Sequence, residues 1–234
     1  MAARAPEAPH ITRRPTLLLL LAGLLGISAA ACLSVQTKVG TVPPTVDSLE
    51  GYASWKLVRE GASSRSRFSF LFVLPDRGVI EISDPLNRTV SRLVVEGKTA
   101  YLVVPGKHAY WKADRSEVMT RLLGFDIRPE ELVALLSGRE HGLNEWSLET
   151  DGLGRVIRGR RGGLEFSVRE FFDRGGLPRT VAFTNGADQG SLKVIRLQFN
   201  QPPREGALRL SFLDDERYRA VGWPEIEKWL RDED

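Results

Sequence analysis

The chain has 234 residues, 33 basic and 30 acidic side chains, and one cysteine. A single cysteine excludes a disulfide within the monomer, so oxidative cross-linking does not stabilise the fold. Without Arg4, Glu7, Arg13 and Arg14 of the N-terminal segment, 30 basic and 29 acidic residues remain. This near-neutral balance gives no electrostatic basis for binding nucleic acid.

Residues 1–31 have the features of an export signal. Arginines precede the apolar run 17–31, which ends in small residues immediately before Cys32. A helix that crosses a bilayer needs about 20 apolar residues, and this run is shorter. A basic start, a short apolar run and small residues at its end together predict a signal peptide. The alternative is a single-pass anchor that is retained.

Cys32 resembles the cysteine of the bacterial lipobox, which is lipidated and becomes the mature N-terminus. Ala29 departs from the leucine that is usual in that motif, and a secreted protein with an incidental cysteine is the alternative. Leu33 stands where an aspartate would resemble an inner-membrane retention signal, which favours the outer membrane. Residues 32–48 lack periodicity and contain Pro43-Pro44, so we expect a flexible tether.

Short runs of strand-like sequence begin after this segment and are separated by turns such as "PDRG" and "DPLN". Such closely spaced runs predict an antiparallel meander. The expected strands are 52–58, 67–74, 78–83, 90–96, 99–104 and 108–113.

The periodicity then becomes helical. Asp114 and Glu117 nearly match a capping box, and Gly124 is a stop signal, which predicts a helix at about 114–124. Pro129 and two following glutamates begin a second helix at about 129–138. Each helix has one apolar face and needs a surface to cover.

Strand-like runs return after the helices, and the chain ends in a charged tail, 214–234, with a short helix. The expected strands are 146–150, 154–160, 164–172, 179–185, 191–199 and 207–213. The fold class is therefore mainly β (α+β). We expect residues 49–213 to form an unclosed antiparallel barrel, or strongly curved sheet, with a helical lid inserted mid-chain.

Catalytic and metal-binding patterns are missing from the sequence. His108 and His141 lie far apart, the serines at 63, 64 and 66 lack a G-x-S-x-G context, and Asp214-Asp215 falls in the charged tail. We therefore expect no enzyme, no metal and no cofactor.

Apolar residues exceed what one face of an ordinary sheet needs. They could form a packed core, or line an apolar cavity between a half-barrel and its two-helix lid. The candidate lining residues are Trp55, Phe68, Phe70, Phe72, Ile80, Ile82, Leu93, Val95, Tyr101, Val103, Leu122, Leu136, Phe166, Val181 and Phe183.

The stretch "ISDPLNRTV", residues 82–90, predicts a tight turn with an uncovered leucine. Asp84-Pro85 opens turns, and Asn87 is at ease in them, but Leu86 is apolar and has polar neighbours. A lone exposed leucine is common and needs no function.

The pattern resembles the LolB family of outer-membrane lipoprotein receptors, whose fold the LolA carriers share. The resemblance runs from about Tyr52 to Phe199. It rests on "DPL", "SRLVVEGKTAYLVV", "VMTRLLGFDIRPEELVALLSG" and "LPRTVAFTNGADQGSLKVIRLQF" in this order behind the lipobox. Asn87 replaces the usual glycine, which asparagine can do in a left-handed turn. The chain also continues for 35 residues past Phe199.

The resemblance implies a monomeric outer-membrane lipoprotein that faces the periplasm and is anchored by lipid at Cys32. It would accept acyl chains of lipoproteins from a LolA-like carrier, hold them in the cavity and help insert them into the membrane. Pro85, Leu86 and Asn87 would form the membrane-insertion loop. The alternative is a lipid-binding or structural envelope-assembly lipoprotein without lipoprotein cargo.

Overall fold

One open sheet forms most of the computed structural model, which describes residues 38–232 apart from 85 and 87. The sheet follows the order β13-β7-β6-β5-β4-β3-β2-β12-β11-β10-β9-β8, with β1 beside β12. Its ends, β13 and β8, do not pair with each other, so the barrel is unclosed, as the sequence predicts. The strands are β1 (Lys38–Val39), β2 (Ser48–Arg59), β3 (Ala62–Val73), β4 (Arg77–Ser83), β5 (Thr89–Glu96), β6 (Thr99–Val104), β7 (Ala109–Asp114), β8 (Ser147–Thr150), β9 (Val156–Arg161), β10 (Leu164–Phe171), β11 (Pro178–Asn185), β12 (Asp188–Phe199) and β13 (Arg219–Ala220).

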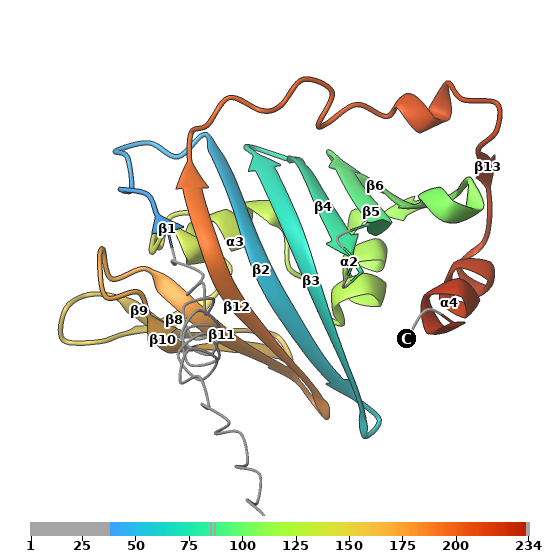
Figure 1. Ribbon diagram of the computed structural model, residues 1–234. Helices are drawn as coiled ribbons and strands as arrows, with labels where there is room; N and C mark the ends of the chain where they lie inside the picture. Colours follow the sequence, from blue (N-terminus) through green and yellow to red (C-terminus); the bar gives the residue numbers. More distant parts are fainter. Residues whose placement is uncertain (1–37, 85, 87, 233–234) are drawn as a thin grey trace, which may run out of the picture. The chain divides into compact units, whose positions relative to one another are not determined.

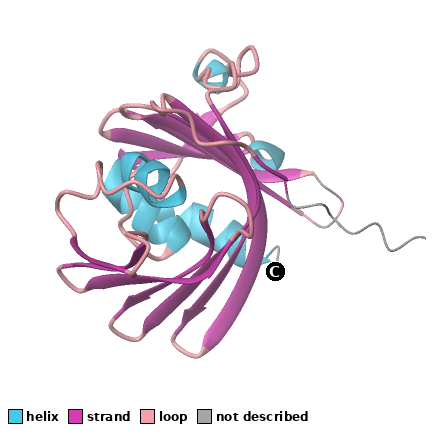
Figure 2. Ribbon diagram, turned by 90° about the vertical axis from the view of Figure 1, so that its left-hand side faces the viewer, coloured by secondary structure: helices cyan, strands magenta, loops and turns pink. Residues whose placement is uncertain are grey.

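Two short helices lie inside the curve of the sheet (Figure 2). They are α2 (Arg115–Leu123) and α3 (Pro129–Leu136), and with residues 124–128 between them we call them the lid. The Asp114 carboxylate accepts a hydrogen bond from the Ser116 N–H at 2.8 Å and caps α2, which ends at Gly124 with a φ of 85°. The remaining helices are η1 (Pro105–Lys107), η2 (Ser211–Leu213) and α4 (Trp223–Asp232), as Figure 1 shows.

Aromatic side chains of the concave inner face lie over glycines of the neighbouring strands. Phe70 stands opposite Gly51 in the β2–β3 register, and a Cβ added to Gly51 would lie 2.3 Å from Phe70 Cζ. Because Gly51 has no side chain, the Phe70 ring can pack directly against its backbone. The same register pairing joins Phe72 with Gly78, Phe166 with Gly159 and Phe183 with Gly190.

The convex outer face carries a second, smaller apolar cluster. Here Leu71, Val79 and Val94 pack with residues of the segment that follows β12, among them Phe212. This C-terminal segment crosses the outer face and adds β13 to the edge strand β7 in parallel (Figure 1). Residues 207–213, expected as a strand, form a loop and η2 instead.

Tyr101 and Val103 belong to this outer cluster and do not line the interior. The prediction that they face the interior is wrong. The stretch "TAYLVV" is apolar at every position from Ala100 on, so no alternation of polar and apolar residues indicates which side chains face inward. The register places Leu102 opposite Leu93, which turns Ala100, Leu102 and Val104 inward.

The tether predicted for residues 32–48 does not extend to residue 48. Lys38–Val39 pairs with Arg196–Leu197 as β1, and the Asn200 side chain accepts hydrogen bonds from the backbone N–H groups of Asp47 and Ser48. Val46 is buried in the core. Residues 38–48 are therefore part of the fold. Cys32 and the signal segment lie outside the described residues.

Candidate functional site

The interior between the sheet and the lid is apolar except for the Trp55 indole N–H. Its lining comes from β2, β3, β4, β12 and the lid, and consists of Trp55, Phe68, Phe70, Phe72, Ile80, Leu123, Ile127, Leu132, Leu136 and Leu192. The free space is about 20 Å³. That is little more than a single water molecule requires. The structure thus shows a closed interior in which lid side chains occupy the space.

The structure brings together six of the residues expected in the lining: Trp55, Phe68, Phe70, Phe72, Ile80 and Leu136. A further five pack in the same core without lining the free space: Leu93, Val95, Phe166, Val181 and Phe183. Ile82 and Leu122 are half-buried against that core.

Four lining residues were missed: Leu123, Ile127, Leu132 and Leu192. Leu132 could have been found, because it lies one helical turn from Leu136 on the same face of α3. Leu192 depends on its register opposite Trp55, which the sequence does not give.

Charged contacts hold α3 against the sheet. Glu131 is 1% exposed, and its carboxylate accepts hydrogen bonds from the Trp146 indole N–H at 2.9 Å and from Arg128 at 2.7 Å. Arg161 of β9 contacts the same carboxylate and also donates to the Asp126 carbonyl oxygen. The hydrogen bond that Arg128 donates to the Glu131 carboxylate raises the pKa of Arg128, so the guanidinium stays charged. These contacts keep the lid closed.

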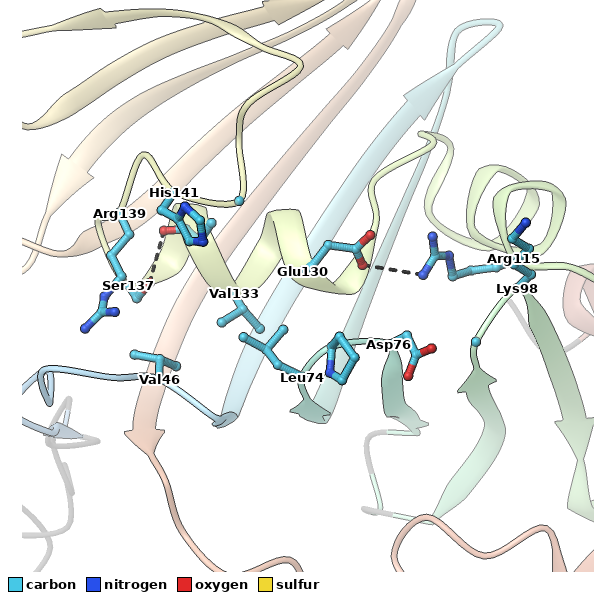
Figure 3. Close-up of a pocket in the computed structure, with 14 residues that line it drawn as sticks. Val46, Leu74, Asp76, Lys98, Arg115, Glu130, Val133, Ser137, Arg139 and His141 are labelled. Atoms are coloured by element: carbon cyan, nitrogen blue, oxygen red, sulfur yellow. Dashed lines mark hydrogen bonds and ion pairs between the residues drawn. The ribbon is translucent and has the colours of Figure 1, made fainter.

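A groove of about 470 Å³ opens at one rim of the sheet, between α3 and the β3–β4 turn. Figure 3 shows its apolar floor, where Val46, Leu74 and Val133 converge. Its edge is charged: Arg115 and Glu130 form an ion pair of 3.4 Å that joins the N-terminal ends of α2 and α3. We call this hollow the rim groove. Its volume is typical of small-ligand sites.

The turn between β4 and β5 presents Leu86 to solvent, with 74% of the side chain exposed. Asp84 Oδ1 accepts hydrogen bonds from the N–H groups of Leu86 and Arg88, both at 2.9 Å, and the Arg88 side chain pairs with Oδ2 at 2.6 Å. The Arg88 N–H lowers the pKa of the Asp84 carboxyl, so Asp84 is charged at neutral pH. Pro85 and Asn87, expected in the same loop, lie outside the described residues.

Comparison with known proteins identifies this architecture. The model of the family "Outer membrane lipoprotein LolB" matches residues 51–201. The chain belongs to the LolB family. It is 24% identical over 188 residues to the outer-membrane lipoprotein LolB of Shewanella amazonensis, which covers 77% of this chain and 88% of the relative. Family membership supports a role in lipoprotein localisation, and LolB is not a family of enzymes.

Solved structures support the fold of this LolB-family chain. A LolA superfamily protein from Nitrosomonas europaea matches with a TM-score of 0.50 and 10% identity over 72% of this chain and 93% of that chain. A DUF1329 family protein from Desulfovibrio piger matches with a TM-score of 0.51 and 10% identity over 72% and 92%. At this identity the likeness concerns the fold alone.

A second turn of the LolB-family chain repeats the chemistry of the first. "DPLNR" (84–88) and "DGLGR" (151–155) share the pattern D-x-L-x-R, and Leu153 is 79% exposed. Asp151 Oδ1 accepts from the N–H groups of Leu153 and Arg155 at 2.9 and 3.0 Å, and Arg155 pairs with Oδ2 at 2.7 Å. The strand register places the two turns at opposite ends of the sheet. Leu153 is therefore a structural match for Leu86 in another location.

Within residues 38–232, apart from 85 and 87, no group of three or more His, Cys, Asp or Glu side chains is placed to hold a metal ion. No helix in the described part of this LolB-family chain is long and apolar enough to cross a membrane.

Proposed function

We propose that this protein receives the acyl chains of lipoproteins from a LolA-like periplasmic carrier and helps insert them into the outer membrane. After removal of residues 1–31, it would be anchored by lipid at Cys32 and would face the periplasm. The observation that carries the proposal is the interior itself: ten apolar side chains, and no polar side chain but the Trp55 indole, under a lid of two short helices.

An acyl chain in water costs about 0.8 kcal/mol per methylene, so cargo needs an apolar enclosure between two membranes. The closed interior has about 20 Å³ of free space, so cargo enters only if the lid moves away from the sheet. Contacts between acyl chains and aliphatic or aromatic side chains are non-directional, which suits a protein that must also release its cargo.

Leu86 would touch the membrane during release. Burial of one leucine yields about 1.5–3 kcal/mol, which is enough for a transient contact and too little to anchor a protein. Asp84 and Arg88 hold the turn so that Leu86 remains exposed rather than folding back onto the sheet.

Leu86→Glu tests this role in a transfer assay from a lipoprotein-loaded carrier to vesicles. We expect the variant to fold normally and to retain cargo without releasing it, because a charged side chain does not enter the acyl region. Leu153→Glu is the matched control, since a second turn of the same type presents an exposed leucine at the other end of the sheet. Normal delivery by Leu86→Glu, or an equal loss in both variants, would refute the role of Leu86.

The alternative is a lipid-binding or structural envelope-assembly protein without lipoprotein cargo. The rim groove favours it, because its apolar floor has room for a free lipid and its edge carries charged groups of both signs, Lys98 and Arg139 beside Asp76 and Glu130. Native mass spectrometry of the protein extracted from membranes separates the two functions. A bound phospholipid or glycolipid would favour the alternative, and a bound lipoprotein would favour the main proposal.

A further inference from the structure

The outer face of the sheet is divided into an apolar part and a basic part. The C-terminal segment covers the apolar part through Phe212 and its neighbours. The basic part lies nearer the β2–β3 hairpin, which reaches the lower edge of Figure 1. It contains five exposed cations, which we call the basic patch: Lys56, Arg65, Arg67, Arg169 and Lys193.

The strand register brings these cations together on one face. Lys56 of β2 lies directly opposite Arg65 of β3. Ser54, on the same face of β2, has Arg67 on one side and Lys193 of β12 on the other. Like charges directly opposite each other destabilise a sheet, so this arrangement works against folding stability.

In the part of the chain that the structure describes, none of the five cations forms an ion pair. Nearby acids have other partners: Glu81 pairs with Arg92 at 3.6 Å, and Asp188 pairs with Arg59 at 3.0 Å. Glu60 at the hairpin tip and Glu170, which accepts a hydrogen bond from Thr180, are exposed acids in the same region, but the five cations outnumber them. The basic patch is therefore a concentrated positive surface on a protein of almost balanced charge.

A shallow hollow of about 210 Å³ lies within the basic patch. Lys56 and Arg169 line it together with the hydroxyl-bearing residues Thr184 and Ser191. Cations and hydroxyl groups around a small hollow are the groups that bind a phosphate.

The strand register places this patch beside the turn that would touch the membrane. Arg67 pairs in the β3–β4 register with Ser83, the last residue before the turn that presents Leu86.

We propose that the basic patch is a docking surface for an anionic phospholipid membrane, whose headgroup phosphates it binds while Leu86 enters the acyl region. This inference rests on the proposed function, because it assumes the membrane contact of Leu86. An acidic protein would also attract the cations. The adjacent exposed leucine favours the lipid surface.

An environment-sensitive fluorophore on the β2–β3 hairpin tests the proposal. Ser63→Cys introduces the label site on the outer face, two residues from Arg65, in a chain whose only other thiol is Cys32. The lipid-anchored protein is reconstituted in vesicles of phosphatidylcholine, alone or mixed with phosphatidylglycerol. We expect a blue shift only with phosphatidylglycerol, and its loss at about 0.5 M salt, where exposed charges are screened.

Two double variants with the same change of charge complete the design. Because each cation near an anionic surface strengthens membrane binding, Lys56→Gln with Arg65→Gln should lower the ratio of docked to undocked protein about thirtyfold. Arg77→Gln with Arg174→Gln removes two exposed cations at the other end of the sheet and should leave the ratio unchanged. Circular dichroism should show both variants folded, because the first one removes a like-charge pair.

A blue shift of equal size on phosphatidylcholine alone would overturn the proposal, as would an equal loss in both double variants. A label that never responds to phosphatidylglycerol would also overturn it and would point to an acidic protein partner. The outcome is independent of Leu86→Glu: a normal transfer by that variant, with the lipid-dependent shift intact, would refute the role of Leu86 in release but leave the docking surface standing.

Discussion

Glu131 of α3 and Arg161 of β9 form an ion pair of 2.5 Å that joins the lid to the sheet. The carboxylate is buried, and Arg161 also lies over the Trp146 ring, 4.9 Å from its centroid. Removing one partner from such a pair leaves the other charge buried and only partly neutralised, which destabilises the fold. The contact therefore contributes to the closed position of α3.

Glu131→Gln should lower the free energy of unfolding by about 3 kcal/mol, because Arg128 and Arg161 would lose their shared carboxylate. Urea denaturation followed by circular dichroism measures the change. If the lid opens before the rest of the fold, hydrogen exchange in 129–136 should accelerate more than exchange in β2.

Glu117→Gln provides the control on the other lid helix. Glu117 pairs with Arg121 at 3.3 Å, but both side chains are more than 40% exposed. Exposed helix pairs contribute about 0.3–0.5 kcal/mol, so the control should change stability little. Equal effects of the two substitutions would contradict the role assigned to Glu131.

Gly51→Ala should destabilise the protein by about 1–3 kcal/mol, because the added methyl group overlaps the core. Its Cβ would lie 2.3 Å from Phe70 Cζ and 2.7 Å from the Arg196 carbonyl oxygen, which is backbone and cannot turn aside. Gly106→Ala is the control, since an added Cβ there meets no atom within 4 Å. Thermal denaturation compares them, and an unchanged melting temperature for Gly51→Ala would contradict the steric overlap with Phe70 and the Arg196 carbonyl oxygen.

The meander and the lid could be predicted from the sequence because both carry strong local signals. Asp114, Gly124 and Pro129 mark helix ends by side-chain chemistry that acts within one turn. The position of the C-terminal segment could not be predicted, because "ALRLSFL" alternates like a strand and its contacts with Tyr101 and Tyr110 depend on residues about 100 positions earlier.

The site was less predictable than the fold. Aromatic residues such as Phe68 and Phe70 indicated the interior face, because they alternate with the polar residues Arg67 and Ser69 in the middle of β3. The rim groove had no signal, since Val46, Leu74 and Val133 come from three separate segments that meet only in the folded chain. The basic patch also depends on register: Lys56, Arg65 and Lys193 are ordinary surface residues until their strands are aligned.

Phe212→Ala should loosen the C-terminal segment from the outer face. The ring is 7% exposed and lies 5.7 Å from the Tyr101 ring and 5.2 Å from the Tyr110 ring. Truncation of a buried phenylalanine costs about 3–5 kcal/mol, and here the loss should appear first as faster proteolysis of the chain after residue 199. Leu213→Ala is the neighbouring control, because Leu213 is 42% exposed. Equal proteolysis of both variants would argue against Phe212 as the attachment point.

Asp84 should keep the Leu86 turn ordered to a lower pH than an ordinary aspartate would allow. The Arg88 N–H lowers the pKa of the carboxyl from its usual 3.8, so the stabilising charge is fully present above that value. It is lost only as the pH falls through the lower value of the folded protein. Carboxyl NMR should place the Asp84 midpoint below 3.8, and a midpoint at or above it would contradict the hydrogen bonds.

At neutral pH, Asp84→Asn tests the same contacts by removing the charge that pairs with Arg88. The amides of Leu86 and Arg88 should then exchange faster with solvent, and cargo transfer should slow less than in Leu86→Glu, because the leucine remains. Asp151→Asn should affect only the amides of Leu153 and Arg155, which bond to Asp151 in the same way. Slower transfer in Asp151→Asn as well would mean that turn order matters at both ends of the sheet and that Leu86 has no special position.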